Sequence, residues 1–167
     1  MHKQFWGGVA LFGLVLLTAG VSVSDEKKES GDKDKKEVEY PELPKGAGKI
    51  DKDAPKKFTE TKSGLKYRVL RKGEGKPPKA TDSVKVNYQG WLDNGKVFDS
   101  SYKRKEPISF PLNRVIKGWT EGMQLVSKGG MIELEIPSDL GYGPRGAPPD
   151  IPGGATLHFL VELLDVE

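Results

Sequence analysis

The sequence contains no cysteine and only two histidines, His2 and His158. The lack of cysteine excludes disulfides, thiolate nucleophiles, iron–sulfur clusters, cysteine–zinc sites and a lipid-modified amino-terminal cysteine. His2 falls in an apolar leader and His158 in an expected strand, so a chain without its leader has no histidine cluster for a metal and no nucleophile–histidine triad. We therefore expect neither a metal nor a cofactor, and any catalysis must proceed without a covalent intermediate.

The chain also lacks a strong charge of one sign. Its 27 lysines and arginines are interleaved with 24 acidic residues, for a formal net charge of +3. This balance provides no electrostatic basis for binding nucleic acid. The length of 167 residues, 35% of them hydrophobic, predicts one domain of ordinary size with additional segments.

Residues 1–24 have the pattern of an export signal. Lys3 precedes the apolar run 5–17, and small residues such as Gly20 and Ser24 follow it. The alternative is an uncleaved membrane anchor, because the apolar run approaches the ~18 residues that begin to span a bilayer. The sequence predicts export to the periplasm or another extracytoplasmic compartment, with membrane attachment only if the leader is retained.

Residues 25–57 are rich in Lys, Glu and Asp and carry few large apolar side chains. Such a segment buries too little apolar surface to offset the entropy of ordering, so we predict a disordered, solvated linker. The alternative is a partner-binding arm, with Val38, Tyr40 and Leu43 as a short contact motif. The segment has no apolar periodicity for a helical dimerisation domain, so we also predict a monomer.

The globular domain is predicted to span residues 58–167 and to be α+β. Ile116, Trp119, Met123 and Val126 fall on one face of a helix that begins near Val115. Period-two alternation predicts strands on either side of this helix, some with one exposed face. The expected strands are residues 65–69, 84–92, 96–99, 108–112, 132–136 and 157–164, the last of them central because it is apolar on both faces.

Two connections stand out between these elements. Asn94-Gly95 predicts a type I′ turn that joins two strands in an antiparallel hairpin. Residues 140–154 are too rich in glycine and proline for regular structure, and loops of this length usually serve a site.

Aromatic residues recur where the expected strands end. Each ring taken alone is typical of a core residue. Asp99, however, directly follows Phe98, and Tyr142 stands in the glycine-rich loop. These placements favour an apolar cup with a few polar groups at its lip, the usual form of a binding site. The aromatic set is Tyr88, Phe98, Trp119, Tyr142 and Phe159.

Four ordered motifs resemble the FKBP family of peptidyl-prolyl cis-trans isomerases. They are Val97-Phe98-Asp99-Ser100-Ser101, Val115-Ile116-Lys117-Gly118-Trp119, Leu140-Gly141-Tyr142-Gly143, and Ala155-Thr156-Leu157 with Val161-Glu162-Leu163-Leu164. The resemblance extends from about Thr59 to Glu167. It implies a curved antiparallel sheet of five to six strands wrapped around one short helix. It also implies isomerase activity on proline-containing polypeptides and inhibition by the macrolides that bind this family.

Carried over position by position, the resemblance implies a proline ring resting on Trp119. Asp99 would be the carboxylate at the edge and Arg104 its partner, while the Tyr142 hydroxyl and the Ile116 amide would donate to a substrate carbonyl. The implied catalytic residues are Phe98, Asp99, Ile116, Trp119 and Tyr142. The remaining implied binding residues are Tyr88, Val115 and Phe159 in the walls and Ile151 from the overhanging loop.

An apolar pocket of this kind is sufficient for the reaction. Amide resonance opposes rotation about an X-Pro bond with a barrier of ~18–20 kcal/mol, and no bond has to break. A site that binds the twisted amide more tightly than the planar one lowers this barrier, and a preference of ~4 kcal/mol accelerates rotation about a thousandfold. The sequence therefore predicts an isomerase that assists folding of exported proteins. The alternative is a proline-binding module or holding chaperone that uses the same pocket.

Overall fold

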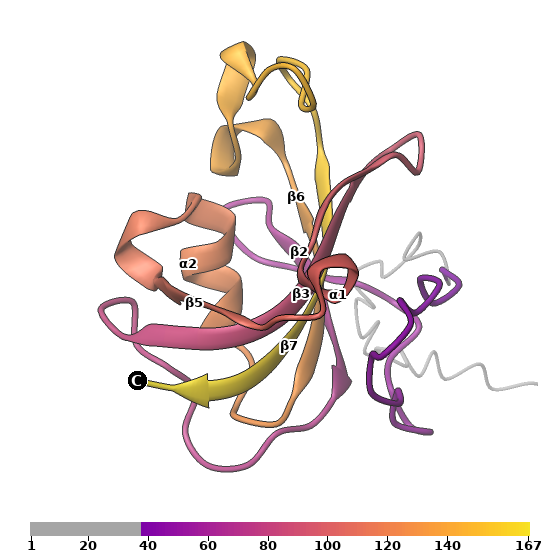
Figure 1. Cartoon of the computed structure of the whole chain (residues 1–167), viewed down its shortest axis with the longest axis vertical. Coiled ribbons are helices and arrows are strands. Elements are labelled where there is room, and N and C mark those ends of the chain that lie inside the picture. Colours follow the sequence, from indigo (N-terminus) through magenta and orange to yellow (C-terminus); the bar gives the residue numbers. More distant parts are fainter. Residues whose placement is uncertain (1–37) are drawn as a thin grey trace, which may run out of the picture. The chain divides into compact units, whose positions relative to one another are not determined.

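A seven-stranded antiparallel sheet with strand order β1-β2-β6-β7-β3-β4 forms the centre of the protein, and β5 pairs with the edge of β3 (Figure 1). The structure, a computed structural model, describes residues 38–167. The predicted leader, 1–24, and the first part of the predicted linker, 25–37, lie outside these residues. The strands are β1 (Thr59–Glu60), β2 (Lys66–Arg71), β3 (Ser83–Leu92), β4 (Val97–Ser100), β5 (Ile108–Pro111), β6 (Met131–Ile136) and β7 (Leu157–Val166).

The predicted central position of the last strand is confirmed. β7 lies between β6 and β3, and its apolar side chains are buried on both faces of the sheet. β4 and β5 share the other edge of β3: β4 pairs with the half that contains Gly90, and β5 with the half that contains Val84. The sheet is curved and partly encloses one face (Figure 1). The sheet has one strand more than expected, because the two-residue β1 adds to the edge of β2.

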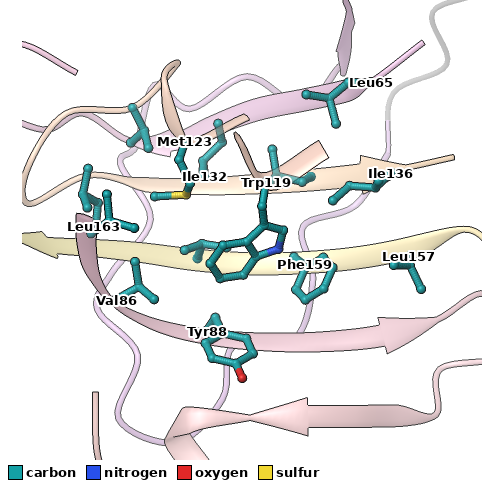
Figure 2. Packing of buried hydrophobic residues seen from close by; sticks show 14 of the residues in the cluster. Leu65, Val86, Tyr88, Trp119, Met123, Ile132, Ile136, Leu157, Phe159 and Leu163 are labelled. Carbon is teal, nitrogen blue, oxygen red and sulfur yellow. The ribbon is translucent and has the colours of Figure 1, made fainter. Parts of the chain in front are cut away.

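One helix of two turns, α2 (Lys117–Met123), packs against the enclosed face. Trp119 and Met123 point into the core, as the apolar periodicity predicted, and Figure 2 shows both among the side chains of the sheet. Gly118 and Gly122 face β6. A Cβ atom on Gly118 would lie 2.5 Å from the Ile136 side chain, so glycine at this position allows the helix to approach the sheet closely.

The remaining helices are single turns. They are α1 (Ser101–Arg104) and the 3-10 turns η1 (Leu112–Arg114), η2 (Ser138–Leu140) and η3 (Gly143–Arg145). The last lies within the loop 140–154, which is therefore partly regular, and the Gly154 amide closes it by donating to the Gly143 carbonyl at 2.9 Å. None of the helices within residues 38–167 has the length and apolar character needed to cross a membrane.

The β3–β4 turn differs from the predicted type I′ turn. Its loop is Asp93–Gly95, and Gly95 has a positive φ of 79° whereas Asn94 does not. A type I′ turn needs positive φ at both central residues, so that prediction is wrong. The Gly95 amide donates to the Leu92 carbonyl at 2.8 Å, as in a type I turn followed by a left-handed glycine. A shift of register between Gly90 and Trp91 accompanies the longer loop.

Residues 38–57, which we call the strap, lie against the second face of the sheet. Tyr40, Leu43 and Ile50 pack on fully buried Leu70, Met131 and Leu160 of the sheet, with Trp91 at the margin. The prediction of a disordered linker is therefore wrong for residues 38–57. It counted only the apolar side chains of the segment, whereas buried residues of the sheet supply the other half of this contact, namely Leu70, Met131 and Leu160. The faces of β2 and β6 that were expected to be exposed are covered for the same reason.

A buried arginine fastens both ends of the strap. The Arg68 guanidinium donates to Glu133 at 2.6 Å, to the Val38 and Lys56 carbonyls at 2.7 and 2.9 Å, and to the Glu39 carbonyl at 2.6 Å. The Arg68 side chain has no exposed surface. Four charge-assisted hydrogen bonds satisfy most of its five donors, which compensates for removing the charge from water.

Further contacts hold the strap and the residue that follows it, Phe58, against the sheet. The rings of Tyr40 and Phe58 lie 5.0 and 4.6 Å from the Arg68 guanidinium, within the range of cation–π attraction. The Tyr40 hydroxyl donates to the Ala54 carbonyl at 2.5 Å. The Gly48 amide donates to the buried Glu162 carboxylate at 3.0 Å.

Candidate active site

A pocket of about 660 Å³ opens between α2, the strands β3–β5 and the overhanging loop 140–154. Nine of the ten residues that the sequence predicted for the site line the pocket. They come from three strands, from α2 and the residues just before it, and from the overhanging loop. The lining residues predicted from the sequence are Tyr88, Phe98, Asp99, Val115, Ile116, Trp119, Tyr142, Ile151 and Phe159. Arg104 does not line the pocket and instead pairs with Asp99 beside it.

The inner part of the pocket is an aromatic well built around Trp119. The rings of Tyr88 and Phe159 each lie 5.3 Å from the Trp119 ring in edge-to-face geometry, and Phe98 meets Phe159 in the same way at 5.5 Å. This arrangement is the favoured packing of aromatic pairs and fixes the orientation of each ring. Figure 2 shows Trp119 with Phe159 beside it and Tyr88 below it. The well therefore offers a preformed apolar surface to a small ring.

Gly90 of β3 makes this packing possible. A Cβ atom at this position would lie 2.6 Å from the Phe98 ring and 2.7 Å from the Phe159 ring. Both distances are far below van der Waals contact, so the two rings occupy the space that a side chain would need.

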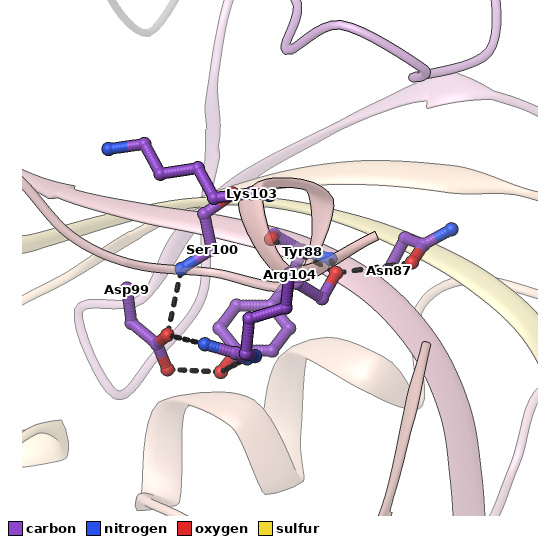
Figure 3. Close-up of polar contacts among 7 residues, drawn as sticks. Asn87, Tyr88, Asp99, Ser100, Lys103 and Arg104 are labelled. Carbon is purple, nitrogen blue, oxygen red and sulfur yellow. Dashed lines mark hydrogen bonds and ion pairs between the residues drawn. The ribbon is translucent and has the colours of Figure 1, made fainter. Parts of the chain in front are cut away.

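A polar cluster closes one edge of the well (Figure 3). The Tyr88 hydroxyl and the Arg104 guanidinium both donate to the Asp99 carboxylate, and Arg104 also donates to the Tyr88 hydroxyl oxygen at 3.1 Å. The Ser100 amide donates to Asp99 at 2.8 Å. Asp99 therefore accepts hydrogen bonds from each of these neighbours in the cluster, and these bonds hold the edge of the well in place.

Two pKa shifts follow from this cluster. Partial burial of Asp99 opposes ionisation, but the hydrogen bonds from Tyr88 and Arg104 outweigh it and hold the pKa of the carboxyl below its ordinary value. Burial, together with the hydrogen bond to Asp99, raises the pKa of Tyr88 to about 12. Asp99 is therefore a carboxylate and Tyr88 a neutral phenol at neutral pH, and neither is poised to transfer a proton.

The turn α1 holds the polar cluster in place. Ser100 caps α1, and its hydroxyl accepts from the Lys103 amide at 3.4 Å. The buried Ser101 hydroxyl accepts from the Tyr88 amide at 2.8 Å. The chain therefore turns directly after Asp99, which brings Arg104 back beside the carboxylate five residues earlier.

Two donors at the mouth of the pocket have no partner within residues 38–167. One is the hydroxyl of Tyr142, whose side chain is exposed in the overhanging loop, and the other is the backbone amide of Ile116. Ile116 is the extended N-cap of α2, so its amide lies outside the helical hydrogen-bond pattern. Both groups are available to a ligand carbonyl.

The sequence did not assign four other lining residues to the site: Phe110, Arg114, Ala147 and Asp150. Phe110 was expected only as a buried strand residue, and its ring lies 5.7 Å from Trp119. Arg114 immediately precedes the Val115-Ile116 pair, and that adjacency was the only signal for it. Ala147 and Asp150 belong to the overhanging loop, whose path over the pocket is set by the tertiary structure.

Residues 74–164 match the family model of the FKBP-type peptidyl-prolyl cis-trans isomerases, over more than half of the chain. The chain belongs to the FKBP family. A probable FKBP-type isomerase of Haemophilus influenzae is 48% identical over 145 residues, which are 87% of this chain and 54% of that protein. The FKBP-type isomerase FkpA of Escherichia coli is 48% identical over 142 residues, 84% of this chain and 49% of FkpA. The chain thus spans about half the length of these two relatives.

Solved structures of FKBP proteins confirm the α+β fold. The crystal structure of FkpA from Escherichia coli superposes with a TM-score of 0.64 at 52% identity, covering 66% of this chain and 51% of FkpA. The structure of AtFKBP13 superposes with a TM-score of 0.61 at 35% identity, covering 66% of this chain and 99% of that one. The predicted family and the predicted fold are both confirmed.

Proposed function

We propose that this protein catalyses cis-trans isomerisation of X-Pro peptide bonds in polypeptides. The observation that supports this proposal is the preformed aromatic well of Tyr88, Phe98, Trp119 and Phe159 with two unpaired donors, Tyr142 and Ile116, at its mouth. A proline ring is apolar and small enough to enter the well. The two donors can hydrogen-bond to the backbone carbonyls that flank the proline ring.

Within this proposal the pocket acts by preferring the twisted amide. A planar amide is charge-separated and is stabilised by water, whereas the twisted amide has lost its resonance and is less polar. The apolar well excludes water and therefore disfavours the planar forms relative to the twisted one. Asp99 acts by holding Tyr88 in place. Its negative charge is compensated by Arg104, so the well stays apolar. A preference of ~4 kcal/mol is enough for a thousandfold acceleration.

We further propose that the protein works outside the cytoplasm as a monomer and assists the folding of exported proteins. The export pattern in residues 1–24 supports the location. Macrolides that bind FKBP proteins should occupy the aromatic well and compete with substrate. Size-exclusion chromatography with light scattering tests the monomer, and a mass of twice the chain would exclude it.

The central experiment is a refolding reaction limited by prolyl isomerisation, followed by fluorescence with and without the protein. The wild type should accelerate the slow phase in proportion to its concentration, and a macrolide should abolish the acceleration. A wild type that leaves the slow phase unchanged would refute the isomerase. Suppression of aggregation should be measured in parallel, because its survival in an inactive Phe98→Ala variant would establish a separate holding role.

A further inference from the structure

Arg114 is a charged lining residue of the pocket that has no acidic partner within residues 38–167. It ends the turn η1, between fully buried Leu112 and the pocket residues Val115 and Ile116. Its side chain is exposed. The backbone of Arg114 is therefore anchored by its neighbours, while its guanidinium is free to contact a ligand.

The other charged lining residues are compensated. Asp99 pairs with Arg104, and Asp150 of the overhanging loop pairs with Lys96 of the β3–β4 turn at 3.1 Å. Two of the three charges that line the pocket are thus neutralised by neighbours outside it. The guanidinium of Arg114 is left as one uncompensated positive charge at the mouth.

The position of Arg114 relates this charge to the bound chain. The Ile116 amide, a proposed donor to a substrate carbonyl, is only two residues further along the backbone. Arg114 and Ile116 both line the pocket, so a polypeptide bound to this amide would pass close to the long Arg114 side chain. Arginine presents several donors in a planar fork that fits a carboxylate, and it remains charged at all physiological pH values.

We infer that Arg114 is a specificity-determining residue that favours polypeptides with an acidic residue next to the proline. This inference rests on the proposed isomerase function and adds a preference to it. The contact is exposed to solvent, so the expected gain in kcat/KM of a Glu-containing peptide over its Gln counterpart is about twofold to fivefold, and salt should reduce it.

The test uses proline peptides with Glu, Gln or Lys at the position before proline, and a second series with the same residues after it. The rate of isomerisation is measured by NMR exchange spectroscopy with the wild-type protein. One of the two series should show the order Glu above Gln above Lys, and the order should flatten at 0.5 M salt, where the Debye length is below about 5 Å.

The decisive variant is Arg114→Glu, which should reverse the order in that series so that the Lys peptide becomes the best substrate. The matched control is Arg145→Glu, because Arg145 is an exposed arginine that also ends a 3-10 turn but does not line the pocket. This control should keep the wild-type order. Circular dichroism of both variants checks that they are folded.

The outcomes separate this inference from the proposed function. If the protein accelerates none of the peptides, including the Gln references, the proposed isomerase function is refuted. Acceleration of the Gln references without a Glu preference in either series would overturn the inference about Arg114 and leave the isomerase intact. An equal change of order in Arg145→Glu would show a general charge effect and would also overturn it.

Discussion

The two faces of the sheet carry similar residue types in opposite states. On the pocket face, half-exposed Asp99 and Arg104 form a cluster with buried Tyr88 beside an open apolar well. On the strap face, Glu133 and Arg68 form a buried pair whose remaining donors are used by strap carbonyls. The comparison shows that the role of an acid–arginine pair depends on whether another part of the chain covers it. Asp99 and Arg104 lie beside an open well and form the edge of a binding site. Glu133 and Arg68 are covered by the strap and hold it against the sheet.

The largest effect is expected from Arg68→Ala on the strap face. The substitution leaves Glu133 buried without its partner and removes the hydrogen bonds that Arg68 donates to three strap carbonyls. The free energy of unfolding should fall by about 3–5 kcal/mol, measured by urea denaturation. The double variant Arg68→Leu with Glu133→Leu is the control, and it should recover part of the loss because no buried charge remains. A loss below about 1 kcal/mol in Arg68→Ala would contradict the fastening role.

Two phenylalanine-to-alanine substitutions, one on each face of the sheet, should affect different measurements. Phe98→Ala removes a wall of the well and should lower kcat/KM for a proline peptide by about 30-fold, equivalent to about 2 kcal/mol. Phe58→Ala removes a ring from Arg68 and should lower the melting temperature while kcat/KM at low temperature changes less than twofold. Equal losses of kcat/KM in both variants would show that the faces are not separate.

The pKa values of Asp99 and Glu133 should be shifted in opposite directions from their ordinary values. Burial raises the pKa of Glu133, and its pairing with Arg68 reduces the rise, whereas the pKa of Asp99 is lowered. The contribution of Asp99 to stability is therefore present above its unfolded pKa and is lost as the pH falls through its folded pKa. Glu133 favours the folded state below its unfolded pKa, and this contribution is lost as the pH rises through its folded pKa.

Carboxyl carbon NMR titration measures both groups directly. The Asp99 resonance should titrate below the ordinary aspartate range and the Glu133 resonance above the ordinary glutamate range. The Asp99→Asn variant should lose the low-pH step and assigns it. An Asp99 pKa above its ordinary value would contradict the hydrogen bonding of the polar cluster.

The smallest effects are expected from two exposed ion pairs, one on each face. Lys96→Ala breaks the contact between the β3–β4 turn and Asp150 of the overhanging loop, and Lys72→Ala breaks the contact between the residue after β2 and Asp53 of the strap. Both pairs are exposed to solvent, so each substitution should shift the midpoint of urea denaturation only slightly. Only Lys96→Ala should change KM measurably, because its partner lines the pocket. A KM change in Lys72→Ala alone would reverse the assignment of the faces.

The pocket was largely predictable because its residues follow local patterns. Alternation placed Tyr88 and Phe159 on inward-facing sides of strands, and the period of the helix placed Trp119 in the core. The family motifs then implied that these residues meet, and the structure brings them together. Phe110 and Asp150 were missed because their place in the pocket depends on how β5 and the overhanging loop cross it.

The strap could not be predicted by the same reasoning. Composition measures what a segment can bury by itself, and residues 38–57 have few large apolar side chains. Their order depends on surface and donors supplied by β2 and β6, above all Leu70, Met131 and Arg68. Alternation in β2 placed Arg68 on an exposed face, because nothing local indicates that a preceding segment folds back over it.

The sequence by itself determined the strands, the short helix, the family and most of the aromatic well, since these depend on periodicity and on contiguous motifs. Only the tertiary structure decided that the second face of the sheet is covered, that Arg114 lacks a partner and that the pocket remains open. Those properties depend on which side chains from distant segments meet, because a buried charge or an unpaired donor is defined by its neighbours in space.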